Sequence, residues 1–183
     1  GLGDVYKRQY YYNILKKKER QIRIKRIFDV VMAVSLIIVL LPIMIAISVA
    51  IKMDSSGPVI FKQVRITTYG RKFHIYKFRT MVAGADKIGS KVTVQGDSRI
   101  TKTGEFLRKY RLDEIPQLFN VLLGDMSFVG TRPEVEKYVH QYNDEMKATL
   151  LLPAGITSLA SIKYKDEDQL SLIHISEPTR LQL

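Results

Sequence analysis

Two adjacent carboxylates with arginines close by are the clearest candidates for chemistry in this sequence. Asp113 and Glu114 stand in the run RKYRLDEIP, residues 108–116, shortly after Arg108 and Arg111. A carboxylate can attack a phosphoryl group to give an acyl phosphate, which divides one difficult displacement into two. Its neighbour can hold a divalent cation or handle a proton. Arginine forks bind phosphate oxygens and would neutralise the charge of a transferring phosphoryl group.

The elements around the pair are predicted to be helical. Thr103 can cap a short helix through Arg111, which would place Arg108 and Arg111 on one face. A second helix is predicted to begin at residues 113–116, because the following apolar residues have helical periodicity and Pro116 is acceptable in a first turn. A helix N-terminus attracts anions. The alternative is that acidic residues simply favour a first turn, and spacing alone does not exclude it.

Three more cations are candidates for phosphate contacts. Lys77 and Arg79 lie in the strand-like run KFHIYKFRT, where they would share one face about 7 Å apart. Arg132 precedes Pro133, which is predicted to open a helix extending to about Met146. For all three, a solvated surface charge is an equally good interpretation.

The remaining pattern indicates a small α+β domain. PVIFKQVRI predicts a strand before the turn signal Tyr69-Gly70, so a short hairpin precedes the carboxylates. Residues 82–100 are predicted to be a long loop, and GITSLASIKY a final irregular or strand segment.

Composition narrows the possible partners. The chain has 183 residues, 46% of them hydrophobic, and no cysteine, which excludes a disulfide framework and a thiolate zinc site. Its three histidines are scattered, but a hard cation held by carboxylates remains possible. The net charge of +11 requires an anionic partner: nucleic acid, phosphate-bearing substrates or acidic lipids.

A long apolar segment points to a membrane. Seven cations lie within residues 16–26, and residues 30–51 then carry no charge. A straight helix of this length would cover roughly 33 Å. Pro42 predicts a kink near its middle. Cations flank both ends, and the positive-inside rule is satisfied at both only if the chain enters and leaves by the same face. A re-entrant helix over residues 27–52 is therefore preferred to a straight span, with Asp29 at the interface.

Several runs resemble the bacterial sugar transferases, and among them the small monotopic phosphoglycosyl transferases that act on polyprenyl phosphate. These runs are KRIFDVVMAV, IYKFRTM, GDSRITKTGEFLRKYRLDEIPQLFNVLLGDMSFVGTRPE and PAGITSLASIKY. The resemblance implies a re-entrant membrane helix, Mg²⁺, and ping-pong transfer of a sugar-1-phosphate from a UDP-sugar to undecaprenyl phosphate with release of UMP. Such a reaction initiates glycoconjugate or exopolysaccharide synthesis at the cytoplasmic face of the bacterial inner membrane.

The resemblance also assigns roles by position. Asp113 would be the nucleophile, close to the Mg²⁺, and Glu114 its catalytic partner. Lys77 and Arg108 match phosphate-contacting positions, and Arg132 matches a residue near the lipid phosphate. Two departures are Leu41 before Pro42, where members commonly have serine, and Thr131 where the family has a first proline in its Pro-Arg-Pro element.

The predicted organisation has five parts. Residues 1–9 and 172–183 are expected to be non-native tails. Residues 10–26 form a basic juxtamembrane segment, residues 27–52 the membrane helix, and residues 53–168 a catalytic domain that is expected to be truncated at its C-terminus. The competing interpretation is a non-enzymatic, membrane-anchored basic module for acidic lipids or nucleic acid. It is disfavoured because the cations concentrate beside the membrane segment and around carboxylates, so no nucleic acid is expected as a partner.

Overall fold

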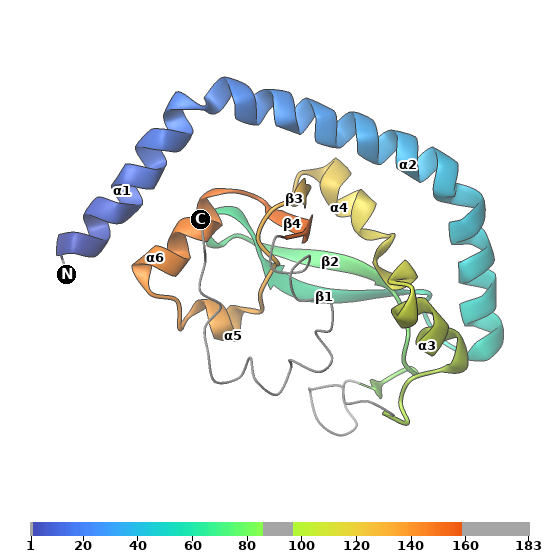
Figure 1. The fold of residues 1–183 in the computed structure, drawn as a ribbon. Coiled ribbons are helices and arrows are strands. Elements are labelled where there is room, and N and C mark those ends of the chain that lie inside the picture. The colour runs from blue at the N-terminus through green and yellow to red at the C-terminus, as the bar shows by residue number, and fades with distance from the viewer. Residues whose placement is uncertain (1, 86–96, 159–183) are drawn as a thin grey trace.

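A computed structural model of the chain describes residues 2–85 and 97–158 (Figure 1). It mixes helices and short strands, as predicted. The helices are α1 (Leu2–Lys17), α2 (Glu19–Asp54), α3 (Lys102–Lys109), α4 (Gln117–Leu123), α5 (Glu136–Val139) and α6 (Asp144–Lys147). The strands are β1 (Ile60–Ile66), β2 (Lys72–Phe78), β3 (Met126–Val129) and β4 (Ala154–Thr157). The predicted C-terminal tail, residues 172–183, lies outside the described residues. In the predicted N-terminal tail, residues 1–9, α1 runs through residues 2–9.

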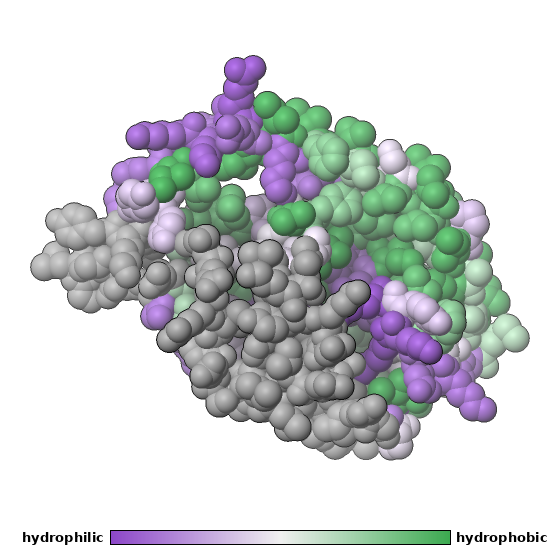
Figure 2. Space-filling model, in the orientation of Figure 1, coloured by the Kyte–Doolittle hydropathy of each residue, from purple (hydrophilic) through white to green (hydrophobic). Residues whose placement is uncertain are grey.

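The predicted membrane segment lies within α2, a helix of 36 residues that continues through Pro42. Figure 1 shows it arching over the rest of the fold. Its buried residues recur three or four positions apart along much of its length, so one face rests on the domain. By length and composition α2 could cross a membrane. Its outward residues, Ile38, Val39 and Ile45 among them, are exposed and apolar, and Figure 2 shows hydrophobic residues gathered along this arc.

The N-terminal half of α2 is tied to the domain by polar contacts. Asp29, only 4% exposed, accepts hydrogen bonds from Ser127 Oγ at 2.7 Å and from Lys25 Nζ at 3.1 Å. Arg26 donates to the carbonyl oxygens of Val121 and Leu122 in the last turn of α4. Asp29 was expected at the membrane interface; it is instead buried against β3, because Ser127 offers it a partner there.

The C-terminal half of α2 reaches the same domain through apolar contacts. Met44, Ile47 and Ile51 form one buried cluster with Phe78 and Leu107. A second cluster joins Ala33 of α2 to residues of β2, α4, β3 and β4: Phe73, Ile75, Val121, Met126 and Ala154. Both halves of the apolar helix therefore pack on one body.

The predicted hairpin is confirmed. β1 and β2 pair antiparallel, with Gln63 opposite Ile75 and Arg65 opposite Phe73. The connection turns at Tyr69 and Gly70, both with positive φ. Asn120 of α4 joins the hairpin to the rest of the core, since its amide accepts from Tyr76 N at 2.9 Å and donates to His74 O at 2.7 Å.

The C-terminal part differs from the prediction. In place of one helix from Pro133 to about Met146, the structure has the single turns α5 and α6, which are separated by a break. The run GITSLASIKY does supply a strand, β4, which pairs parallel with β3. Gly130 and Gly155 meet beside this pair: a Cβ on Gly155 would lie 2.2 Å from Gly130 N, so only glycine allows the approach. Part of the predicted loop at 82–100 lies outside the described residues.

Candidate active site

The carboxylate pair lies in a 3₁₀ turn between two helices. α3 ends at Lys109, and Arg111 adopts a left-handed conformation with φ of 54°, which redirects the chain into the turn Leu112–Glu114. The next helix, α4, begins at Gln117 with Pro116 as its N-cap. The pair therefore precedes the helix by three residues, close to the predicted position but outside the first turn of α4.

Apolar packing fixes this turn. Leu112 and Ile115, on either side of the carboxylates, pack against the cluster formed by α2, β2 and α3. The partly buried Leu112 and Ile115 side chains hold the backbone, and the polar residues between them, Asp113 and Glu114, turn toward β2. Their side chains are 13% and 17% exposed, so both remain open to a ligand.

Lys77 of β2 faces both carboxylates. Its Nζ atom lies 2.6 Å from Glu114 Oε1 and 4.0 Å from Asp113 Oδ2. The structure thus brings together three of the predicted site residues from two elements that are distant in the sequence.

The two carboxyl groups differ in their electrostatics. Burial raises the pKa of Asp113, and the charge of Glu114 adds to this shift against the opposing effect of Lys77. Burial also acts to raise the pKa of Glu114, but the charge and hydrogen bond of Lys77, with Arg132 and Arg111, outweigh it and lower that pKa. Glu114 is therefore held ionised by a fixed cation, whereas Asp113 lacks a direct ion pair of comparable length.

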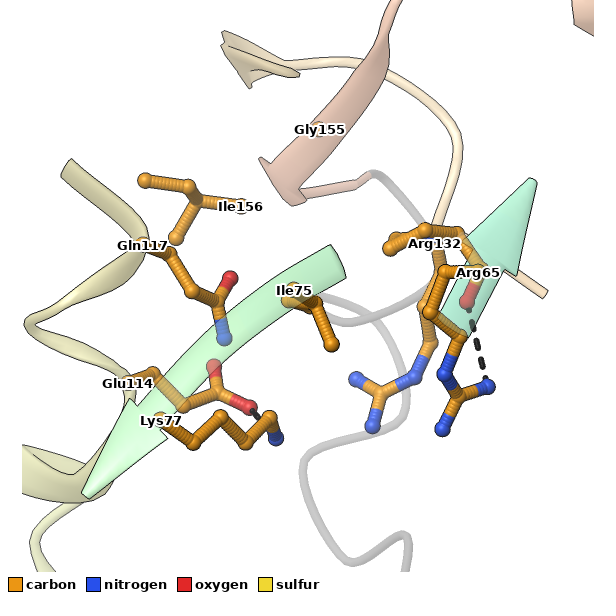
Figure 3. A pocket seen from close by; sticks show the side chains of 9 residues that line it. Arg65, Ile75, Lys77, Glu114, Gln117, Arg132, Gly155 and Ile156 are labelled. Atoms are coloured by element: carbon orange, nitrogen blue, oxygen red, sulfur yellow. Dashed lines mark hydrogen bonds and ion pairs between the residues drawn. The ribbon is translucent and has the colours of Figure 1, made fainter. Parts of the chain in front are cut away.

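A pocket opens beside Lys77 and Glu114 (Figure 3). Figure 3 shows two ends to it on either side of Ile75, with Lys77 and Glu114 near Gln117. The guanidinium groups of Arg65 and Arg132 lie at one end, and the Gln117 amide with Ile156 lies at the other. The remaining lining residues are Ile75, Pro133 and Gly155. One end is thus cationic and the other is polar but neutral.

Arg108 and Arg111 both lie near the carboxylates, but not on one helix face as predicted, because α3 ends before Arg111. Arg108 donates from Nε to Thr80 Oγ1 at 2.9 Å, and its charge acts to lower the pKa of Asp113. Arg111 is exposed and its charge acts on Glu114.

Arg79 does not join this cluster. The prediction that Lys77 and Arg79 share a strand face is wrong, because β2 ends at Phe78. Arg79 is 6% exposed and donates to Ser55 O at 2.7 Å and Ser56 O at 2.8 Å, just after the end of α2. These bonds fix the junction between the apolar helix and the hairpin. A phosphate contact would require Arg79 to leave its carbonyl partners.

Sequence reasoning missed three residues of the pocket: Arg65, Gln117 and Gly155. Arg65 is half-buried and anchored by Gln63 Oε1 at 2.8 Å. Burial lowers the pKa of its guanidinium, Glu134 opposes this shift and Arg132 adds to it. The hairpin register could have revealed Arg65, since pairing across Tyr69-Gly70 places it on the same face as Lys77. No local signal marks Gln117 or Gly155.

The donor set suits a hard cation that also binds substrate. Among the described residues no cluster of three or more acidic, histidine or cysteine side chains could enclose a metal. Mg²⁺, however, is usually bound by one or two carboxylates together with substrate phosphates and water. Asp113 and Glu114 supply such carboxylates, so the residues present fit Mg²⁺ as a substrate-bridging ion.

Comparison with known proteins identifies a family that this chain matches. Residues 20–182 match the pattern of the family described as bacterial sugar transferase. A similar protein from Aeromonas hydrophila is named UDP-N-acetylgalactosamine-undecaprenyl-phosphate N-acetylgalactosaminephosphotransferase; it is 46% identical over 67% of this chain and 29% of its own length. The Escherichia coli UDP-glucose:undecaprenyl-phosphate glucose-1-phosphate transferase is 41% identical over 76% of this chain and 31% of its own. The undecaprenyl-phosphate galactose phosphotransferase of Salmonella typhimurium is 34% identical over 85% of this chain and 35% of its own length. The chain spans about a third of the length of these relatives.

Proposed function

Because this chain belongs to the bacterial sugar transferase family, we propose that it transfers a sugar-1-phosphate from a UDP-sugar to undecaprenyl phosphate. The observation that carries this proposal is the carboxylate pair held beside Lys77, which together with Glu114, Arg65 and Arg132 lines a pocket. Relatives named for this kind of transfer to undecaprenyl phosphate support it. The reaction would begin the assembly of a lipid-linked glycan.

In the first half-reaction, an Asp113 carboxylate oxygen attacks the phosphorus that bears the sugar. A P–O bond forms to Asp113 and the P–O bond to the bridging oxygen breaks, so that UMP leaves with that oxygen. The raised pKa of Asp113 describes the site without substrate; the carboxylate must be ionised to attack.

In the second half-reaction, an oxygen of undecaprenyl phosphate attacks the same phosphorus. The bond to Asp113 breaks, the lipid diphosphosugar forms, and the carboxylate is restored. The two steps balance without a net proton, and the sequence of release and binding is ping-pong.

The surrounding residues position and neutralise the phosphates. Lys77 lies within reach of both carboxylates and would contact the transferring phosphoryl group. Arg65 and Arg132 would hold further phosphate oxygens at the cationic end of the pocket, where guanidinium forks match their geometry. Arg108 and Arg111 would add positive charge near Asp113 and Glu114 respectively. Glu114 would hold Lys77 in place and, with Asp113, bind Mg²⁺, which supplies charge neutralisation at the diphosphate.

The packing of α2 supports a re-entrant placement in the cytoplasmic membrane. A straight span would carry one end of α2 to the far side of the bilayer, yet residues of both halves pack on the same domain. A helix that dips into one leaflet keeps its exposed apolar face in lipid and the domain in the cytoplasm. The basic segment before it would contact acidic headgroups.

UMP release from a panel of UDP-sugars, measured with undecaprenyl phosphate and Mg²⁺, tests the proposal. Asp113→Asn should lower turnover at least about a thousandfold, whereas Asp125→Asn, a carboxylate paired with Arg71 outside the pocket, should retain most of it. Mass spectrometry should find a phosphosugar on the Asp113 peptide when donor is supplied without acceptor. Lipid product formed by Asp113→Asn at the normal rate would remove Asp113 as nucleophile.

The Asp113→Asn variant also distinguishes the enzyme from the competing interpretation. A non-enzymatic basic module would bind acidic lipid or nucleic acid with a steep dependence on salt, and Asp113→Asn would leave that binding unchanged. The concentration of cations around Lys77 and the carboxylates favours the enzyme.

A further inference from the structure

Gln117 is a buried amide that faces the pocket. The residue is 2% exposed and lines the pocket. Figure 3 shows its side chain extending from α4 toward the space between Ile75 and Glu114. Within the described residues, no hydrogen bond or other polar interaction of this side chain is found. Among the described residues only Arg79 Nε is fully enclosed without a partner, so the unbonded amide of Gln117 is open to the pocket and available to a ligand that enters it.

A nearby residue shows what an amide with only a structural role looks like. Asn120, one turn further along α4, is fully buried and uses both ends of its amide, on Tyr76 N and His74 O. The two amides lie on the same short helix, and only the one lining the pocket is without protein partners. The Gln117 amide is therefore available to bond something that enters the pocket.

The charges that line the pocket indicate which part of the substrate would contact Gln117. Phosphate oxygens belong at the end with Arg65 and Arg132, where two guanidinium groups lie together. Gln117 lies on the other side of Ile75 from them, beside Glu114, with the apolar side chains of Ile75 and Ile156 nearby. A neutral amide in that setting suits an uncharged group that both donates and accepts hydrogen bonds, flanked by C–H surface. A pyranose ring has this chemistry.

We propose that Gln117 hydrogen-bonds the sugar of the UDP-sugar and contributes to the choice of donor. The inference rests on the proposed function for the identity of the ligand. The amide N–H would donate to, and its carbonyl accept from, a ring hydroxyl or an acetamido group. A site built around such a bond discriminates strongly against a sugar that cannot make it, because the buried amide is then left unpaired.

Equilibrium binding tests this inference separately from turnover. The full chain carrying Asp113→Asn, chosen because its turnover should be at least about a thousandfold lower, is titrated with UDP-N-acetylgalactosamine, UDP-galactose, UDP-glucose and UDP. Adding Gln117→Leu should weaken binding of the best UDP-sugar about tenfold or more and leave UDP within about twofold. Gln141→Leu, the same change at an exposed glutamine outside the pocket, should leave both affinities unchanged.

Deoxy-sugar donors locate the contact. For the best donor, removal of the contacted hydroxyl should weaken binding to the protein with Gln117 but not to the Gln117→Leu protein, whereas other deoxy positions should act equally on both. An equal loss for UDP and UDP-sugar, no loss at all, or no binding of any UDP-sugar would overturn the inference. Selective loss of UDP-sugar affinity together with no UMP release by the unmutated chain would instead overturn the proposed function alone. Thermal unfolding of each variant shows whether a loss reflects the fold.

Discussion

Lys77 and Glu114, 37 positions apart in the sequence, form an ion pair of 2.6 Å between the hairpin and the turn that carries the carboxylates. The pair explains why Glu114 has a lowered pKa despite its burial, and it holds a cation 4.0 Å from Asp113. Two functions are thereby joined: Lys77 fixes the turn and presents charge where a phosphoryl group would bind.

Lys77→Met should lower the rate of UMP release about a hundredfold or more, because it removes a preorganised cation from the developing charge. The pKa of Glu114 should rise at the same time, since burial would no longer be opposed by Lys77. Kinetics with saturating acceptor measure the first effect. Lys62→Met, an exposed cation on the other strand near the Tyr76 ring, is the control and should change the rate little. A normal rate for Lys77→Met would contradict the assignment.

Arg79→Lys should reduce stability and leave the KM for the UDP-sugar unchanged. A lysine cannot reproduce the fork that donates to Ser55 and Ser56, so about 2 kcal/mol of unfolding free energy should be lost. Denaturant unfolding in detergent and steady-state kinetics measure the two quantities. Arg71→Lys, an exposed residue paired with Asp125, should change stability by less than about 1 kcal/mol. A raised KM for the UDP-sugar with unchanged stability would instead support Arg79 as a phosphate contact.

Asp29→Ala should loosen the N-terminal half of α2 from the domain. The change leaves Ser127 Oγ without its acceptor and removes the carboxylate partner of Lys25 Nζ, which keeps only Ser127 Oγ, at a cost of about 1–3 kcal/mol. Limited proteolysis and thermal unfolding report it. Glu19→Ala removes an exposed pair with Arg23 on the same helix and should cost no more than about 0.5 kcal/mol. Equal effects of the two changes would argue against a buried anchor.

Labelling of single cysteines decides the placement of α2. The chain has no cysteine of its own, so Lys18→Cys and Ser56→Cys, at exposed positions on either side of the helix, can be labelled without background. A re-entrant helix predicts that an impermeant maleimide reaches both from the cytoplasmic side and neither from outside. Labelling of the two from opposite sides would establish a straight span, and the chemistry proposed for the pocket would be unaffected.

The sequence pattern predicted the elements whose formation depends on neighbouring residues. The hairpin follows from two β-rich runs around Tyr69-Gly70, and the apolar segment of α2 from an uncharged run. The predicted side-chain positions were wrong where a partner distant in the sequence determines them. Asp29 is buried because Ser127 comes to it, and Arg79 turns from the hairpin because two carbonyls at the end of α2 are within reach. Thr101, not Thr103, caps α3, with its side chain accepting from Gly104 N.

The pocket shows the same division. Asp113, Glu114 and Lys77 could be selected by type and spacing, or by resemblance, but their meeting depends on β2 lying against the turn. Gln117 looks like an ordinary polar residue at a helix start, and only the fold shows that its amide lines the pocket while that of Asn120 is bonded. Gly155 has a role only because β4 approaches Gly130.

With α2 in the membrane as proposed, the bonds from Arg26 to the end of α4 would hold the domain close to the lipid. α4 has seven residues and is therefore about 10 Å long, with the membrane helix bonded at its last turn and Gln117 at its first. Leu112 and Ile115, beside the carboxylates, also pack against the cluster that includes Met44, Ile47 and Ile51 of α2, so the reacting groups would lie near the headgroups. An acceptor can then present its phosphate to the nucleophile while its long isoprenoid tail stays dissolved in the hydrocarbon, so no extraction of lipid into water is required.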